Sequence, residues 1–131
     1  MRALAAAPAG GAAWPEFARA LGQASAVIVP SLVLAEVDYF LRNQRAATRR
    51  LVAEIFDPST RYEYEHVLPV DIVRALHIDA KFAQLNLGLV DGVVAAVAER
   101  RRVYRVLTID RRDFEPLRVG EHFTRPLRLV P

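Results

Sequence analysis

Hydrophobic and polar positions along the chain follow two patterns, helical spacing and short continuous apolar runs. Helical spacing predicts helices over residues 14–21, 31–42, 45–56, 69–85 and 92–101. Short runs bounded by turn residues predict strands over 26–29, 62–68, 105–109 and 126–130. Because strands alternate with helices, we expect an α/β fold with a mainly parallel sheet, in which the last strand lies at an edge.

Local signals mark the boundaries of these elements. Gly22 is expected to end the first helix, and Ser31 to cap the second. After a connector over 86–90, Asp91 is expected to cap the helix over 92–101. A tight turn is expected over 110–114.

The length of 131 residues suits one domain, which we expect to span residues 1–131. Residues 1–13 are small and alanine-rich, and we expect them to form a loop or be disordered. Apolar stretches are too short to cross a bilayer, and the N-terminus lacks the strong apolar segment of a signal peptide. We therefore expect a cytoplasmic protein without a membrane partner.

The chain contains no cysteine, which excludes disulfides, thiolate zinc sites and cysteine nucleophiles. Its three histidines are scattered without the spacing of metal motifs. Its glycines form neither a dinucleotide-binding fingerprint nor a P-loop, and no serine stands in a nucleophile elbow. Any metal is therefore expected to bind mainly through oxygen ligands.

The net charge of +3 comes almost entirely from arginine, since Lys81 is the only lysine. Arginine suits the geometry of phosphate groups, so the charge permits a nucleic-acid partner. The runs Arg100–Arg102 and Arg111–Arg112 are candidates for contact with RNA phosphates. The alternative is that each run is a solvated helix end, where positive charge also suits the helix dipole.

Glu36 lies on a predicted helix among apolar neighbours. The residues three and four positions away are Leu32, Val33, Tyr39 and Phe40. We therefore expect its carboxylate to be surrounded by apolar side chains, and so to be paired with an arginine, protonated or bound to a metal. Asp38, in contrast, has Arg42 four residues on and is expected to form a surface ion pair.

Asp91 and Asp110 lie where functional groups gather in parallel α/β sheets. Asp110 follows an apolar strand at its carboxyl end, and Asp91 precedes an apolar helix. Each also has an ordinary structural explanation as a cap or turn residue, as does Asp113. A cluster of carboxylates at a sheet edge is self-repelling unless a cation holds it, and Mg²⁺ takes such oxygen ligands at about 2.0 to 2.1 Å.

Three segments resemble the second, third and fourth acidic motifs of the VapC-type PIN domain. They are VPSLVLAEV over 29–37, LGLVDG over 87–92 and LTIDRRDF over 107–114. The segments occur in the family's order and at about its spacing, and the resemblance extends over residues from about 14 to 131.

The resemblance implies a PIN fold and a Mg²⁺- or Mn²⁺-dependent endoribonuclease, the toxin of a type II toxin–antitoxin system. Glu36, Asp91 and Asp110 match the family's metal-site and catalytic acids, and Asp113 matches less closely. The implied partners are an RNA substrate, a cognate antitoxin that blocks the site, and a second copy of the chain in a homodimer. We expect the antitoxin to cover apolar side chains on the helices over 31–42 and 45–56.

The N-terminus departs from the family's pattern. The family opens with an apolar strand that ends in an aspartate followed by serine or threonine, and no such segment precedes Trp14. We therefore expect the central strand and the first acid to be missing. We also expect upstream codons to encode them, with Met1 in the loop that follows.

Two other hypotheses remain. A PIN-like remnant that lost catalysis with its first acid would bind antitoxin or RNA without cutting. A flavodoxin-like regulatory domain would need a phospho-acceptor aspartate at the end of the first strand, which this sequence lacks. An antitoxin gene beside this one would favour a toxin pair.

Overall fold

A five-stranded sheet forms the centre of the computed structural model, which describes residues 2–5, 14–108 and 111–130. The strands lie in the order β3-β2-β1-β4-β7, and every neighbouring pair is parallel. They are β1 (Arg2–Ala5), β2 (Ala26–Pro30), β3 (Tyr62–Glu65), β4 (Arg105–Leu107) and β7 (Arg128–Val130). The predicted α/β fold with a mainly parallel sheet is confirmed, and β7 is an edge strand as predicted.

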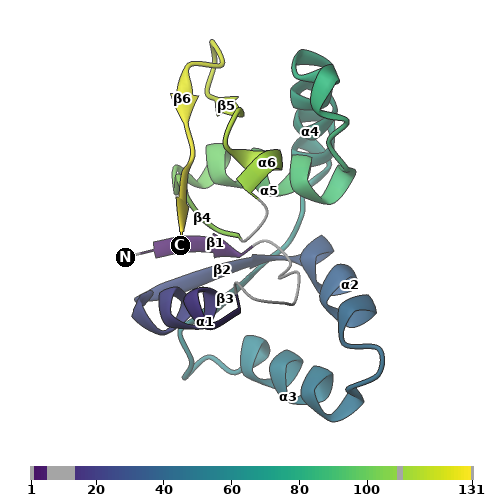
Figure 1. The fold of residues 1–131 in the computed structure, drawn as a ribbon, viewed down its shortest axis with the longest axis vertical. Helices are drawn as coiled ribbons and strands as arrows, with labels where there is room; N and C mark the ends of the chain where they lie inside the picture. The colour runs from purple at the N-terminus through teal and green to yellow at the C-terminus, as the bar shows by residue number, and fades with distance from the viewer. Residues whose placement is uncertain (1, 6–13, 109–110, 131) are drawn as a thin grey trace.

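Helices cover both sides of this sheet. They are α1 (Trp14–Gln23), α2 (Ser31–Phe40), α3 (Arg45–Phe56), α4 (Pro69–Lys81), α5 (Leu89–Arg101) and α6 (Arg111–Phe114). In Figure 1, α4, α5 and α6 lie above the sheet and α3 lies below it. A 3-10 turn (Ala83–Leu85) follows α4, and β5 (Arg118–Val119) pairs with β6 (Arg125–Pro126) in a small antiparallel sheet.

β1 occupies the central position of the sheet, between β2 and β4. The prediction that this strand is missing is therefore wrong for Arg2–Ala5. Leu4 is fully buried and pairs with β2 on one side and β4 on the other. The segment has little strand propensity of its own, but a neighbour on each side satisfies its backbone groups. Residues 6–13, the rest of the predicted N-terminal loop, lie outside the described residues.

Several predicted boundaries shift by a few residues. Gly22 lies inside α1 instead of ending it, and the hydroxyl of Ser31 accepts a hydrogen bond from the Val67 N–H at 3.2 Å instead of capping α2. β3 ends at Glu65, earlier than predicted. Its partner there is Pro30, the last residue of β2, so the ladder has no neighbouring strand beyond this point.

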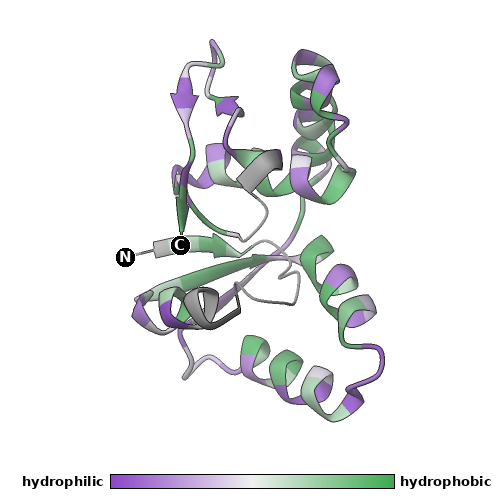
Figure 2. Cartoon of the chain, in the orientation of Figure 1, coloured by the Kyte–Doolittle hydropathy of each residue, from purple (hydrophilic) through white to green (hydrophobic). Residues whose placement is uncertain are grey.

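The core is built around α5. Its middle residues, Val93 to Ala98, are all buried, and it packs against α4 on one side and against β1 and β2 on another. A helix that is apolar all round is typical of a fully enclosed position, and Figure 2 shows hydrophobic residues along β2 and in α5. In the part of the chain that the structure describes, no helix is both long and apolar enough to cross a membrane.

Candidate metal centre

The carboxyl edge of the sheet brings together the elements that carry two of the candidate acids. β2 runs directly into α2, so Glu36 lies just beyond the end of β2. Only residues 102–104 join α5 to β4, so α5 runs opposite to the strands and its first turn, with Asp91, reaches the same edge. α2 and α5 contact each other, and Figure 1 shows α2 at the tip of the β2 arrow.

Glu36 is exposed, so the prediction that apolar side chains surround it is wrong. α2 turns Val33 and Val37 into the core and leaves Glu36 at the surface. Its apolar neighbour Tyr39 is itself 68% exposed. Desolvation by nearby protein atoms still raises the pKa of the Glu36 carboxyl above its ordinary value of 4.5. An exposed carboxylate needs no internal partner and is accessible to a hydrated cation.

Asp38 forms a surface ion pair, but with a different arginine from the predicted one. Arg45 of α3 donates a hydrogen bond from Nη1 to Oδ1 of Asp38 at 2.7 Å, and both side chains are about half exposed. Arg42 instead donates to the carbonyl of Tyr39 and lies over its ring. Asp38 therefore belongs to the contact between α2 and α3, apart from the site.

Asp91 lies inside the first turn of α5, so it is not the cap that the sequence predicted. Gly88 occupies the N-cap position and the helix begins at Leu89, two residues before Asp91. Asp91 is half-buried, and the helix dipole stabilises negative charge at this end. The next residue, Gly92, allows α4 to come close: a Cβ there would lie 3.2 Å from Cβ of Ala75.

The remaining candidate acids follow β4. Asp110 lies outside the described residues. Asp113 is half-buried in the first turn of α6. Among the residues that the structure describes, no group of three or more carboxylates and imidazoles is arranged to hold a metal. Glu36 and Asp91 offer only carboxylate oxygens, the donors that Mg²⁺ and Mn²⁺ prefer, so the described residues fit part of such a site in their chemistry.

The arginines at the end of α5 form ion pairs within the protein. Arg100 donates from Nε to Oδ1 of Asp71 at 2.8 Å and from Nη2 to Oδ2 at 3.0 Å. This hydrogen bonding raises the pKa of Arg100. Arg101 binds Glu65, which also lies 3.8 Å from Nη1 of Arg100. These two arginines are therefore not merely solvated at a helix end, and their contact with RNA stays a prediction. The side chains of Arg111–Arg112 lie outside the described part.

The structural role of Asp71 was not predicted from the sequence. It is 2% exposed, and besides binding Arg100 it accepts a hydrogen bond from the Leu68 N–H at 2.8 Å. Its only signal in the sequence is an acid in the first turn of a helix, which is common at the surface as well. A second such link joins α4 and α5, because Arg74 binds Glu99 at 2.9 Å.

Comparisons with known proteins agree with this architecture. A model of the PIN domain family matches residues 5–118. Ribonuclease VapC26 of Mycobacterium tuberculosis is 29% identical over 103 residues, covering 77% of this chain and 76% of that protein. The crystal structure of Mycobacterium tuberculosis VapC20, a Sarcin-Ricin loop cleaving toxin, is similar with a TM-score of 0.67 at 19% identity, covering 83% of this chain and 91% of that one. At this low identity the structural likeness shows the fold alone.

Proposed function

This chain belongs to the PIN domain family, and we propose that it is an endoribonuclease that depends on Mg²⁺ or Mn²⁺ and serves as the toxin of a VapBC-like type II toxin–antitoxin pair. The observation that carries the proposal is the meeting of α2 and α5 at the carboxyl edge, with Glu36 on one and Asp91 on the other. The name of one relative supports the nuclease part of the proposal, since VapC26 is a ribonuclease.

Glu36, Asp91 and Asp110 are the proposed metal ligands and catalytic acids. A bound Mg²⁺ or Mn²⁺ supplies a water of lowered pKa and stabilises charge on a phosphodiester. Exposure of Glu36 leaves this edge open to a bulky strand of RNA. Asp91 lies in the first turn of α5, where the helix dipole stabilises a negative charge.

A second candidate function follows from the sequence before α1. No acidic residue precedes Glu16, so the family's first acid has no counterpart here. A site with one carboxylate fewer attracts a divalent cation less strongly, because each ligand contributes charge. The chain would then be a PIN-like module that binds antitoxin or RNA without cutting.

Incubation of the purified chain with total RNA tests the two candidates. With MgCl₂ or MnCl₂ the nuclease cuts RNA, and with EDTA it does not. Calorimetric titration with MnCl₂ gives a separate measure of metal binding, with Asp91→Asn as the control that lacks a ligand. A chain that binds Mn²⁺ weakly, leaves RNA intact and still binds its antitoxin would establish the binding module instead.

The proposed antitoxin site covers the outer faces of α2 and α3. Tyr39, Phe40 and Phe56 are exposed there, and Figure 2 shows hydrophobic stretches along both helices. Leu41 and Leu51 are only partly buried, so the single subunit leaves apolar surface on both helices. Exposed apolar patches of this kind mark sites of protein association.

The proposed homodimer uses α4. Val70, Val73 and Leu76 are each more than half exposed and follow one another at spacings of three residues, so they form one apolar stripe. Because this stripe is on a different helix from the antitoxin surface, a second copy of the chain and an antitoxin can bind at the same time.

A further inference from the structure

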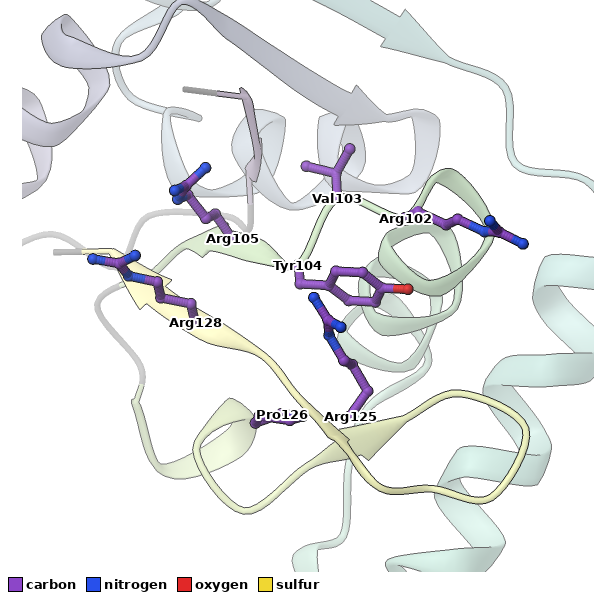
Figure 3. Close-up of a pocket in the computed structure, with 7 residues that line it drawn as sticks. All are labelled: Arg102, Val103, Tyr104, Arg105, Arg125, Pro126 and Arg128. Carbon is purple, nitrogen blue, oxygen red and sulfur yellow. The ribbon is translucent and has the colours of Figure 1, made fainter.

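A basic pocket lies on the opposite edge of the sheet from the acidic residues. Its volume is about 710 Å³. Four arginines, Arg102, Arg105, Arg125 and Arg128, line it together with Tyr104 and two apolar residues, and no acid is among the lining residues (Figure 3). This size falls within the usual range of ligand sites, roughly 300 to 1,000 Å³.

The parallel sheet places two of these arginines side by side. Arg105 is the first residue of β4 and Arg128 the first of β7, and the two are register partners. Figure 3 shows both side chains extending from neighbouring strands in the same direction. Like charges in this relation repel each other. An anion bound between them would remove that repulsion.

The other two arginines, Arg125 and Arg102, come from other segments that line the pocket. The guanidinium carbon of Arg125 lies 4.1 Å from the centre of the Tyr104 ring. Arg102 follows α5 with a left-handed backbone, φ 54°, a position that glycine or asparagine usually occupies. The fold thus keeps an arginine at a place where its backbone is unfavourable.

These four arginines differ from the others near them in lacking carboxylate partners. Arg74, Arg100 and Arg101 each bind a glutamate or aspartate. Within the described ranges, none of the four pocket arginines forms an ion pair. Guanidinium groups that are free of carboxylates offer planar pairs of donors that match phosphate oxygens.

We propose that this pocket binds phosphate groups of an RNA strand, remote from the acidic centre. The proposal takes its ligand class from the proposed function, since RNA is the substrate there. Asp91 and Arg102 lie at opposite ends of α5, about 16 Å apart along the helix axis at 1.5 Å per residue. A strand of several nucleotides is therefore needed to reach from one edge to the other, so the pocket favours long RNA over short fragments.

Binding of a fluorescently labelled single-stranded RNA in EDTA tests this pocket without any contribution from metal or cleavage. The variant Arg125→Gln with Arg128→Gln removes two exposed pocket charges, and the variant Arg49→Gln with Arg50→Gln removes two exposed charges from α3. We expect the pocket variant to bind about tenfold more weakly. For the pocket variant, the slope of the logarithm of the binding constant against the logarithm of the salt concentration should be shallower by about 1.4. Each contact with a single-strand phosphate contributes about 0.7 to this slope. The α3 variant should bind like the unaltered chain.

Three results would overturn the proposal. Equal weakening in both variants would mean that only total charge matters. Displacement of the RNA by AMP or inorganic phosphate at the same phosphate concentration would assign the pocket to a small free anion. If the pocket variant lost antitoxin binding while its RNA binding was unchanged, the pocket would be assigned to an acidic protein segment.

Competition by unlabelled oligonucleotides that strengthens with their length supports binding of an RNA strand. Cleavage in MgCl₂ is scored separately, so RNA binding through the pocket without cleavage would reject the nuclease and keep the pocket.

Discussion

Glu36 and Asp91 carry their charges in different surroundings. Glu36 is exposed on α2, whereas Asp91 is half-buried in the first turn of α5, beside the close contact of Gly92 with α4. Substitutions at the two positions are therefore expected to have the same effect on metal-dependent activity, for different structural reasons.

Asp91→Asn is expected to abolish Mg²⁺-dependent RNA cleavage and leave the fold intact. The amide has the same shape and keeps hydrogen-bonding capacity, but it loses the charge that a divalent cation requires. Cleavage of total RNA and far-UV circular dichroism measure the two effects. Undiminished cleavage by a folded variant would reject the assignment of Asp91 as a ligand.

Glu36→Gln is also expected to abolish cleavage, and to change the free energy of unfolding by less than about 0.5 kcal/mol, the usual range for surface substitutions. Desolvation raises the pKa of Glu36 on folding, so the ionised carboxylate is slightly disfavoured in the folded chain. Loss of this charge should therefore not destabilise the fold. Urea unfolding without metal checks this. A large loss of stability would instead reveal an internal partner.

At the scale of secondary-structure elements, ion pairs join α4 to α5, and Gly92 allows the two helices to approach closely. Asp71 and Arg74 on α4 bind Arg100 and Glu99 on α5. Glu99 also accepts a hydrogen bond from the Gly120 N–H at 2.8 Å, which ties the loop after β5 to the same helix. Since Asp91 lies at the other end of α5, these contacts position the candidate metal centre from a distance.

Asp71→Ala is expected to destabilise the chain by about 2–3 kcal/mol, because it leaves the guanidinium of Arg100 without its buried partner. The matched control is Asp38→Ala, which breaks an ion pair with Arg45 that is about half exposed on both sides. That loss should be less than about 1 kcal/mol. Urea unfolding of both variants makes the comparison, and equal losses would show that the Asp71 pair has no special role.

Gly92→Ala is expected to destabilise by about 1–3 kcal/mol, because the new Cβ would meet Cβ and the backbone oxygen of Ala75 at 3.2 and 3.3 Å. Backbone oxygen cannot move aside as a flexible side chain can. Gly22→Ala is the control: nothing lies within 4 Å of a Cβ there, and alanine in this helix should stabilise by about 0.5–1 kcal/mol. Thermal unfolding distinguishes the two, and stabilisation by both would mean that α4 and α5 separate easily.

Across the whole molecule, the fold separates surfaces of different chemistry. Glu36 and Asp91 lie on helices that meet at the carboxyl edge of the sheet and the arginine pocket lies at the amino edge, while α2, α3 and α4 carry exposed apolar residues. Each proposed partner therefore has its own surface, and variants of one surface can be tested without disturbing the others.

Tyr39→Ser with Phe56→Ser is expected to weaken binding of the cognate antitoxin by tenfold or more, since aromatic anchors contribute about 2 kcal/mol or more to an interface. Val73→Ser with Leu76→Ser on α4 is the matched control, expected to keep antitoxin affinity and reduce self-association. Calorimetry and sedimentation measure these effects. Antitoxin binding that depends on α4 but not on α2 and α3 would reverse the two assignments.

Local sequence patterns were enough to predict most elements and part of the site. Helical spacing and the prolines at their boundaries placed α2 and α3 almost to the residue, because these signals depend on neighbours a few positions away. The order of strands and helices predicted the parallel sheet. The acidic motifs identified Glu36 and Asp91 as candidates, and both lie on elements that meet at one edge.

Long-range packing decided the rest. β1 is a short alanine-rich segment that becomes the central strand only because β2 and β4 pair with it on either side. The direction of the Glu36 side chain depends on which face of α2 meets the core, and the ion pair between Asp71 and Arg100 joins residues far apart in the chain. The arginine pocket likewise forms from the loop after α5 and from β4, β6 and β7. Local spacing carries no information on such contacts, since their energy arises only when distant segments are already folded together.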